Sequence, residues 1–436
     1  MTLESVKISP SVQLSAIRTD RFKTGVLTFT LVTPLSPEST ALHILLSGIM
    51  RRGTKRYPSL SLINRRLDEL YATEIEIRSS KLGKNILFTL TAELLDNRYA
   101  LDSTDILAEV IDTAAEILLC PLSSDHAFDA ATVEQEKRCA LDSLNAEINN
   151  TRAYSITRCT ELMYRERAQY PTVKRIKEIL ADTDATRLYA HYQNLLKTAR
   201  LDVFYVGSTP TETVAKHVSA AFSGYPCGEK AGMLPISAAS PSPMLFETEK
   251  MPVSQGKLAL GFRTGVCASE TKRYHPALVL NEIFGGSAAS KLFLNVREKM
   301  SLCYFCSSSY SIYTGDLMVS SGIEVGNLSV AYDAILRQMD DIKNGLISDT
   351  EFSAAQKSLE NCYRQIYDNP LEMQGFFGTR AFFGIEESIE ECRERLASVT
   401  KQEVVDFAEK TVHDTAFFVE GTKTANDGEE VLEDDE

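Results

Sequence analysis

A weak internal repeat is the feature of this 436-residue sequence that most constrains its fold. The same order of predicted elements occurs twice: a strand, an apolar helix, an amphipathic helix, two strands, two longer helices and a closing strand. The opening strands are residues 25–32 and 256–263, and the closing strands are residues 201–207 and 416–421. Because the spacing between matching elements is nearly constant, the pattern indicates duplication of one folding unit.

The stretch between the two halves, residues 226–255, contains five prolines and a cluster of serines, and its composition predicts a linker. The predicted domains are therefore residues 1–225 and 256–424, followed by an acidic, disordered tail at 425–436. Each half mixes strands with pairs of helices. The expected fold class is α+β, with two tandem homologous domains, each a mostly antiparallel sheet with helices packed on one face.

Charge and cysteine usage narrow the class of function. The formal net charge is -14, which disfavours nucleic acid as a partner because a phosphate backbone would be repelled. Nine cysteines are scattered without a disulfide framework, which is typical of a reducing compartment. The N-terminal residues show no signal-peptide pattern, and no apolar run is long enough to span a membrane. We therefore expect a cytoplasmic protein that does not bind membranes.

The apolar helix predicted at residues 41–50 is followed by the pair Gly53-Thr54. This layout resembles the pitrilysin group of zinc peptidases, the inverzincins, which includes insulin-degrading enzyme and mitochondrial processing peptidase. In active members this helix carries H-x-x-E-H a few residues before a Gly-Thr pair: the two histidines bind zinc and the glutamate activates a water. Aligned on that pair, the matching positions here are Ile44, Ser47 and Gly48, and none can bind zinc or act as a base.

The third zinc ligand of the family is a glutamate on a later helix, in a pattern like E-R-x-V-V-x-x-E. Residues 136–143 match this frame and put Ser143 at the ligand position. With all four positions changed, the resemblance implies a short bacterial-type member that has no zinc of its own and no catalytic residue in this chain. His43 has no histidine or glutamate three or four residues away, so we interpret it as a structural histidine.

The second half resembles the family where the substrate is held. Residues 285–299 are similar to the family's Gly-rich turn, helix and R-E-K stretch. Active members use an arginine and a tyrosine seven residues apart to hold the substrate backbone over the zinc, and Arg297 and Tyr304 match in type and spacing. Without this resemblance, we would interpret Arg297 as one member of a surface ion pair and Tyr304 as a residue at the start of a strand.

Other motifs in this region do not support a different chemistry. The pair Gly285-Gly286 lacks the Gly-Lys-Ser/Thr ending of a phosphate-binding loop. The motif Cys303-x-x-Cys306 stands alone at the start of an alternating strand, so we interpret its cysteines as buried small residues rather than as a redox or metal site. The sequence contains no Gly-x-Ser-x-Gly motif of a serine hydrolase.

In the short bacterial and mitochondrial members, two chains of this size assemble so that the zinc of one faces the arginine and tyrosine of the other. The resemblance therefore implies a non-catalytic subunit of a heterodimeric zinc peptidase, which holds a peptide substrate over the zinc of a homologous partner chain. Two alternatives stay open. One is a stand-alone homodimeric pseudo-peptidase that acts as a peptide binder or structural scaffold, and the other is an active metalloprotease with relocated ligands.

Overall fold

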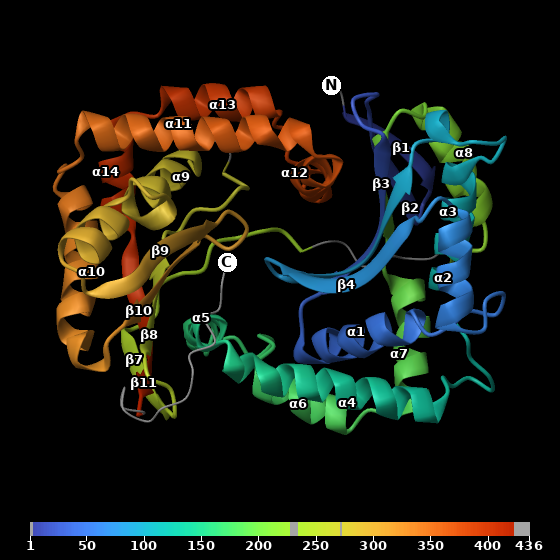
Figure 1. Cartoon of the computed structure of the whole chain (residues 1–436), viewed down its shortest axis with the longest axis horizontal. Coiled ribbons are helices and arrows are strands. Elements are labelled where there is room, and N and C mark those ends of the chain that lie inside the picture. Colours follow the sequence, from blue (N-terminus) through green and yellow to red (C-terminus); the bar gives the residue numbers. More distant parts are fainter. Residues whose placement is uncertain (1–2, 227–233, 271–272, 423–436) are drawn as a thin grey trace. The chain divides into compact units, whose positions relative to one another are not determined.

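The computed structural model describes residues 3–226, 234–270 and 273–422, and the chain folds into two compact units (Figure 1). Unit 1 comprises Met1–Asn145, Arg167–Ile236 and Cys362–Ser388, and unit 2 comprises Ala146–Glu166, Ser237–Asn361 and Ile389–Glu436. The predicted acidic tail at 425–436 lies outside the described residues. Each unit contains one sheet with helices, which confirms the predicted α+β class.

The sheet of unit 1 has six strands in the order β1-β2-β6-β3-β5-β4. Its strands are β1 (Leu3–Ser9), β2 (Val12–Arg18), β3 (Thr24–Pro34), β4 (Glu74–Leu82), β5 (Asn85–Leu95) and β6 (Leu201–Gly207). Neighbouring strands are antiparallel except β2 and β6, which are parallel. Alternation along β3 puts Leu27 and Phe29 in the hydrophobic core. Thr28 lies on the opposite face.

Helices cover the apolar face of this sheet, with α1, α3, α7 and α8 packed against its strands. The helices of the first half in unit 1 are α1 (Pro37–Met50), α2 (Leu60–Glu69), α3 (Ile106–Leu119), α4 (Ala130–Ala146), α6 (Val173–Ala181), α7 (Ala185–Thr198) and α8 (Thr211–Ala221). Helix α1 begins at the capping residue Ser36, whose hydroxyl accepts the backbone N–H of Ser39 at 3.0 Å.

The sheet of unit 2 repeats this topology in the order β7-β11-β8-β10-β9. Its strands are β7 (Leu245–Met251), β8 (Gly256–Arg263), β9 (Cys303–Ser311), β10 (Asp316–Ile323) and β11 (Val412–Gly421). The parallel pair β7 and β11 matches β2 and β6, and the other neighbours are antiparallel. The predicted linker at 226–255 was therefore wrong at its C-terminal end, where β7 pairs with β11.

Helices also cover one face of the second sheet. They are α9 (His275–Asn281), α10 (Leu328–Lys343), α11 (Asp349–Gln365), α13 (Ile389–Ser398) and α14 (Lys401–Lys410), with two wider helical segments at Glu282–Gly286 and Leu292–Lys299. Phe262 of β8 packs against Phe284 on this face, with ring centroids 6.0 Å apart. The second of these helical segments ends at Lys299, and strand β9 begins at Cys303.

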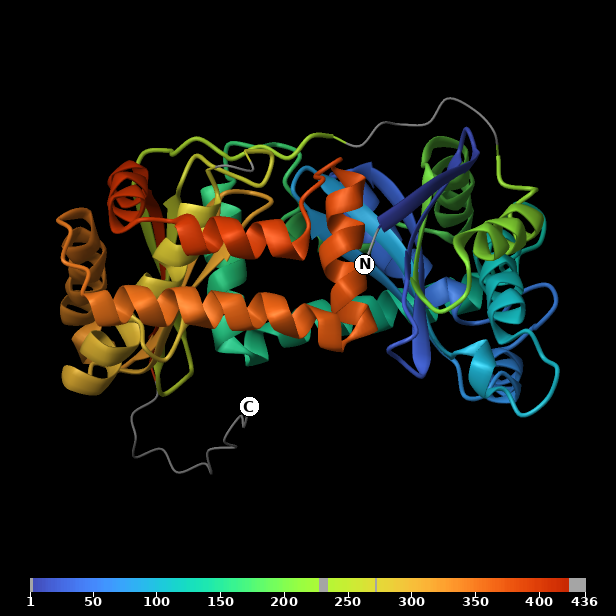
Figure 2. The ribbon, with the colours of Figure 1, turned by 90° about the horizontal axis from the view of Figure 1, so that it is seen from above.

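The other face of each sheet is covered by a helix from the other half of the chain. In unit 2, α5 (Thr151–Met163) packs on β8, β10 and β11, and in unit 1, α12 (Pro370–Phe382) packs on β3 and β6. Figure 2 shows the orange helix α12 beside the blue strands of unit 1. The two compact units therefore differ from the predicted ranges 1–225 and 256–424 by this exchange of one helix each.

A buried polar network fixes α5 to the sheet of unit 2. The guanidinium of Arg263, 2% exposed, pairs with the carboxylates of Asp316 and Asp414, with 3.0 Å from its Nε to Oδ2 of Asp414. It also donates to the carbonyl of Met163 at the end of α5 and lies 4.5 Å from the ring centroid of Tyr164. Burial works against the charge of Arg263, but the two carboxylates outweigh it and raise its pKa.

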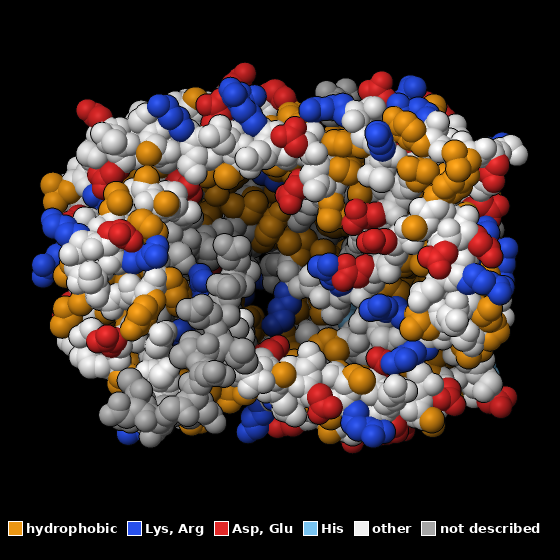
Figure 3. All heavy atoms as spheres, in the orientation of Figure 1, with side chains coloured by type: hydrophobic (Ala, Val, Ile, Leu, Met, Phe, Trp, Pro, Cys, Tyr) orange, Lys and Arg blue, Asp and Glu red, His pale blue; other side chains and the backbone are white. Residues whose placement is uncertain are grey.

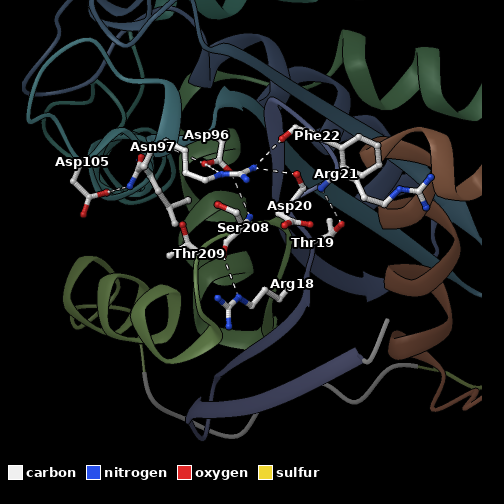
Figure 4. A network of polar contacts seen from close by, with 12 residues as sticks. Arg18, Thr19, Asp20, Arg21, Phe22, Asp96, Asn97, Asp105, Ser208 and Thr209 are labelled. Atoms are coloured by element: carbon white, nitrogen blue, oxygen red, sulfur yellow. Dashed lines mark hydrogen bonds and ion pairs between the residues drawn. The ribbon is translucent and has the colours of Figure 1, made fainter.

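A second network ties together strand ends in unit 1 (Figure 4). Arg98 donates from Nε to Oδ1 of Asp96 at 2.9 Å and from a terminal nitrogen to the carbonyl of Phe22 at 3.1 Å. The other carboxylate oxygen of Asp96 accepts the backbone N–H of Ser208 at 3.3 Å. Burial opposes the charge of Asp96, but these hydrogen bonds outweigh burial and lower its pKa. The network joins the segments that follow β2, β5 and β6.

Among the described residues, no helix combines the length and the apolar composition that crossing a membrane requires.

Candidate functional site

The three positions that match the family's zinc-binding helix lie on α1 and carry no ligand group. Ile44 packs its side chain against the hydrophobic core. The hydroxyl of Ser47 donates to the carbonyl of Ile44 at 2.7 Å, so it is satisfied within its own helix. Gly48 has no side chain. None of these groups offers the imidazole or carboxylate that zinc prefers.

The space beside Gly48 is filled by the carboxylate of Glu136, which comes from α4. A Cβ atom at Gly48 would lie 2.2 Å from Oε2 of Glu136. The same carboxylate accepts a hydrogen bond from Nε of Arg52 at 2.5 Å and forms an ion pair with it. Arg52, just beyond the end of α1, is therefore the ionic partner of Glu136. Sequence reasoning missed this pair because its two members are 84 residues apart.

The position of the third ligand is exposed. Ser143 lies on α4, where its side chain faces solvent. A serine hydroxyl is a poor zinc ligand compared with a carboxylate. The neighbouring Asp142 is exposed as well.

His43 lies on the buried side of α1 and is 0% exposed. Its ring packs against Phe88 and His191, with centroids 5.5 and 5.2 Å away. Within the described residues, neither ring nitrogen of His43 has a hydrogen-bond partner. Burial, and then the nearby His191, lower the pKa of His43 to about 3, so the ring is neutral at neutral pH. This packing fits the interpretation of His43 as a structural histidine, although neither of its nitrogens is hydrogen-bonded within the described residues.

Arg297 and Tyr304 both lie in unit 2 and both are accessible. The side chain of Arg297 is 40% exposed, and Tyr304 is 53% exposed. The guanidinium of Arg297 lies 4.7 Å from the ring centroid of Phe293, and its Nε is 3.6 Å from the carboxylate of Glu298. These contacts orient the arginine but leave several of its five N–H donors for another molecule.

A tight turn sets the separation between this pair. The segment Leu292–Lys299 ends where the N–H of Met300 donates to the carbonyl of Asn295 at 3.0 Å. Ser301 follows with a φ of 52°, a left-handed conformation that reverses the chain. The side chain of Asn295 also donates to Oε1 of Gln338 on α10 at 2.7 Å. The arginine therefore sits on a helical segment that is anchored to a second helix.

Gly285 lets this helical region approach β9 closely. A Cβ atom there would lie 2.7 Å from the backbone nitrogen of Ser308 and 2.7 Å from a methyl carbon of Leu292. Any larger residue would push the segment away from the strand that carries Tyr304. The Gly-rich turn noted in the sequence thus has a packing role that positions the arginine and the tyrosine.

A β-bulge also affects Tyr304. Strand β9 pairs with β10 so that Phe305 lies opposite Gly322 and Cys303 lies opposite Ile323, which leaves Tyr304 as the extra residue. Bulges commonly re-aim a side chain, and Tyr304 is the most exposed large apolar side chain at this end of the strand. No local sequence pattern predicts this bulge.

Comparisons with known proteins find relatives of this chain in sequence and in structure. Residues 182–359 match the family model of the peptidase M16 inactive domain. A protein of Bacillus subtilis (strain 168), named probable inactive metalloprotease YmfF, is 31% identical over 415 residues, which cover 94% of this chain and 96% of that protein.

Solved structures share the whole fold. A conserved protein from Enterococcus faecalis V583 is 26% identical and superposes with a TM-score of 0.88, covering 98% of this chain and 100% of that one. A peptidase M16 inactive domain from Pseudomonas fluorescens is 15% identical with a TM-score of 0.79, covering 97% and 99%.

Proposed function

This chain belongs to the peptidase M16 family, and we propose that it is a non-catalytic subunit that holds a peptide substrate for a zinc-bearing partner chain of that family. It is an inactive family member. The four positions that would carry the zinc ligands and the base hold Ile44, Ser47, Gly48 and Ser143.

The observation that carries the proposal is the contrast between these four positions and the pair Arg297 and Tyr304. Ile44 is apolar, Ser47 is hydrogen-bonded within its own helix, and Gly48 and Ser143 offer neither an imidazole nor a carboxylate. The pair keeps the donors that hold a peptide, and both side chains are accessible. A chain selected only as a scaffold has no chemical reason to keep an exposed arginine and tyrosine at this spacing.

The chemistry of the pair suits a peptide backbone. A guanidinium presents a planar fork of donors to carbonyl oxygens, and a phenol adds one more donor. Both also stabilise the oxyanion that forms when a zinc-bound water attacks a peptide carbonyl. In our proposal that zinc belongs to the partner, and this chain supplies Arg297 and Tyr304.

Exposed sheet edges offer a further means of holding a peptide. Among the described residues, β4 (Glu74–Leu82) pairs with β5 alone and β9 (Cys303–Ser311) pairs with β10 alone. An extended peptide can add to such an edge through main-chain hydrogen bonds. This mode tolerates many sequences, which suits a subunit that handles short peptides or unfolded segments.

The proposed partners and location follow from the same features. On the face shown in Figure 3, Lys and Arg side chains are interspersed with Asp and Glu instead of forming one basic patch, which supports a peptide rather than a nucleic acid as ligand. No cysteine among the described residues forms a disulfide, which supports a cytoplasmic location.

The test is to mix the purified chain with a zinc-bearing member of the family and to measure cleavage of a fluorogenic peptide. We expect cleavage by the mixture and none by this chain alone. Replacing Arg297 by Ala should lower turnover about 10²–10³-fold, because one oxyanion donor is lost. Replacing Tyr304 by Phe should cost roughly tenfold, since it removes one hydrogen bond.

The matched control is Arg273→Ala, which removes an exposed arginine of unit 2 that pairs with Glu270. Its turnover should equal that of the unmutated mixture, and gel filtration should show that every variant still forms the complex. If Arg297→Ala forms the complex and cleaves at the unmutated rate, the chain is a scaffold and the proposal is wrong.

A further inference from the structure

The bulge in β9 brings together two cysteines that a regular strand would separate. Residues three apart in a strand point to opposite faces. Here Cys306 lies opposite Ser321 of β10, and Cys303 lies opposite Ile323, with Tyr304 as the extra residue. Directly opposed residues share a face, and Ser321 and Ile323 are two residues apart, so both cysteines project to the same face of the sheet.

The surroundings give the two thiols different properties. Cys303 is 9% exposed and Cys306 is 4% exposed, and both are free. The neighbouring Cys306 thiol lowers the pKa of Cys303, although burial opposes this and nearby Arg297 adds to it. The neighbouring Cys303, together with burial, raises the pKa of Cys306 well above its usual value.

We propose that Cys303 and Cys306 form a redox-active dithiol, which a small peroxide oxidises reversibly to a disulfide within β9. The roles follow from the surroundings: Cys303 is the more exposed, more acidic thiol and attacks, and Cys306 keeps its proton and resolves. A peroxide is small enough to reach a largely buried sulfur at the edge of a sheet. The sequence alone favoured two inert buried residues, because it could not reveal that they share a face.

The reaction balances in two steps. The thiolate of Cys303 attacks one oxygen of hydrogen peroxide, so an S–O bond forms, the O–O bond breaks and hydroxide leaves as water, giving a sulfenic acid. The sulfur of Cys306 then attacks the sulfur of Cys303, so the S–S bond forms, the S–O bond breaks, and the departing hydroxide takes the proton of Cys306 as water. Two sulfurs each lose one electron, and the peroxide is reduced to two waters. A dithiol reductant reverses the change by thiol–disulfide exchange.

Oxidation would also move Tyr304, and this consequence rests on the proposed function. A disulfide holds its sulfurs about 2.05 Å apart. The bond would draw the two ends of the bulge together and re-aim the tyrosine between them. Peroxide would thereby weaken the hold on the peptide without touching Arg297.

The test is to treat the full-length chain with hydrogen peroxide, alkylate the remaining thiols and analyse tryptic peptides by mass spectrometry. Residues 300–337 contain no lysine or arginine before Arg337, so both cysteines lie in one peptide. We expect this peptide to lose two alkylatable thiols and two hydrogen atoms, and to recover both thiols after reduction. Oxygen added to its methionines is scored separately by fragmentation.

Two variants identify the roles. Cys306→Ser should leave Cys303 as a sulfenic acid that dimedone traps, whereas Cys303→Ser should leave Cys306 reduced. Cys362, an exposed cysteine, is the internal reference. The proposal is overturned if both cysteines stay reduced at a peroxide concentration that oxidises Cys362, or if Cys303 proceeds to sulfinic acid with Cys306 still alkylatable. Because these readouts need neither partner nor peptide, their failure is separable from failure of the proposed function.

Discussion

The two units share a sheet topology, but the positions that match the family's functional residues are filled in unit 1 and exposed in unit 2. In unit 1, a side chain of the chain itself fills the space beside α1, the helix that matches the family's zinc-binding helix. Glu136 lies over Gly48 and pairs with Arg52. In unit 2, Arg297 and Tyr304 point outward with few partners of their own. The positions that match the zinc site are thus closed by the chain's own side chains, whereas the pair that we propose to hold a substrate is open to another molecule.

The largest expected effect is the difference in unfolding free energy between replacing the buried Arg263 and replacing the exposed Arg297, both of which lie in unit 2. Arg263→Met leaves the buried carboxylates of Asp316 and Asp414 unpaired, and removal of one partner of such a network costs about 3–5 kcal/mol in unfolding free energy. The same change at Arg297 should cost less than about 0.5 kcal/mol, as is usual for surface positions. Urea unfolding of both variants measures the difference, and equal losses would mean that Arg297 has a structural role.

The repeat, and with it most of the fold, could be predicted from sequence because each half has its own periodicity. The opening strand predicted at 256–263 was correct, and the apolar helix predicted at 41–50 lies within α1. The strand β7 was missed because it lies in a stretch rich in proline and serine, and its partner β11 is far along the chain. Short-range patterns carry no information on such pairings.

The candidate site could be predicted only where the sequence resembles the motifs of the family. That resemblance indicated Arg297 and Tyr304, and the structure places both on accessible surface of one unit. It gave no indication of the pair Arg52 and Glu136, since a salt bridge between distant helices depends on their packing. The shared face of the cysteines beside Tyr304 depends on a bulge, which is set by register with β10 and not by the local sequence.

The next effect is the pH dependence of stability that arises from His43, on the buried side of α1. Unfolded histidine binds a proton below its ordinary pKa of 6.5, whereas burial lowers the pKa of His43 to about 3 and that of His191 to about 4. Between about pH 4 and 6.5 the unfolded state therefore holds more protons, so stability falls as the pH falls through this window. At pH 5 the loss should be about 2 kcal/mol for His43.

Urea unfolding at pH 7 and pH 5 tests this effect. His43→Leu should lessen the loss of stability on acidification, while the exposed His126, replaced by Asn because its φ of 60° suits asparagine, should leave it unchanged. The same acid sensitivity in the His43→Leu variant and the unmutated chain would rule out the assignment.

A smaller effect tests the closure of the zinc-site position directly. The methyl group of Gly48→Ala would meet the carboxylate of Glu136 and disturb its pair with Arg52. Overpacking costs about 1–3 kcal/mol, and the better helix propensity of alanine returns about 1 kcal/mol, so the net loss should be about 1 kcal/mol. Ser143→Ala, at the exposed ligand position, is the control and should change stability by less than about 0.5 kcal/mol. Thermal unfolding of both variants decides, and a stabilised Gly48→Ala would show that the site is open.

The most direct test of the account is whether this chain holds a peptide without metal. Fluorescence anisotropy of a labelled unstructured peptide would be followed while the purified chain is added in the presence of a zinc chelator. We predict saturable binding that weakens roughly 10–100-fold in the Arg297→Ala variant, because a hydrogen bond from a charged donor contributes about 1.5–3 kcal/mol. Absence of binding, binding that requires added zinc, or unchanged affinity in Arg297→Ala would contradict the account.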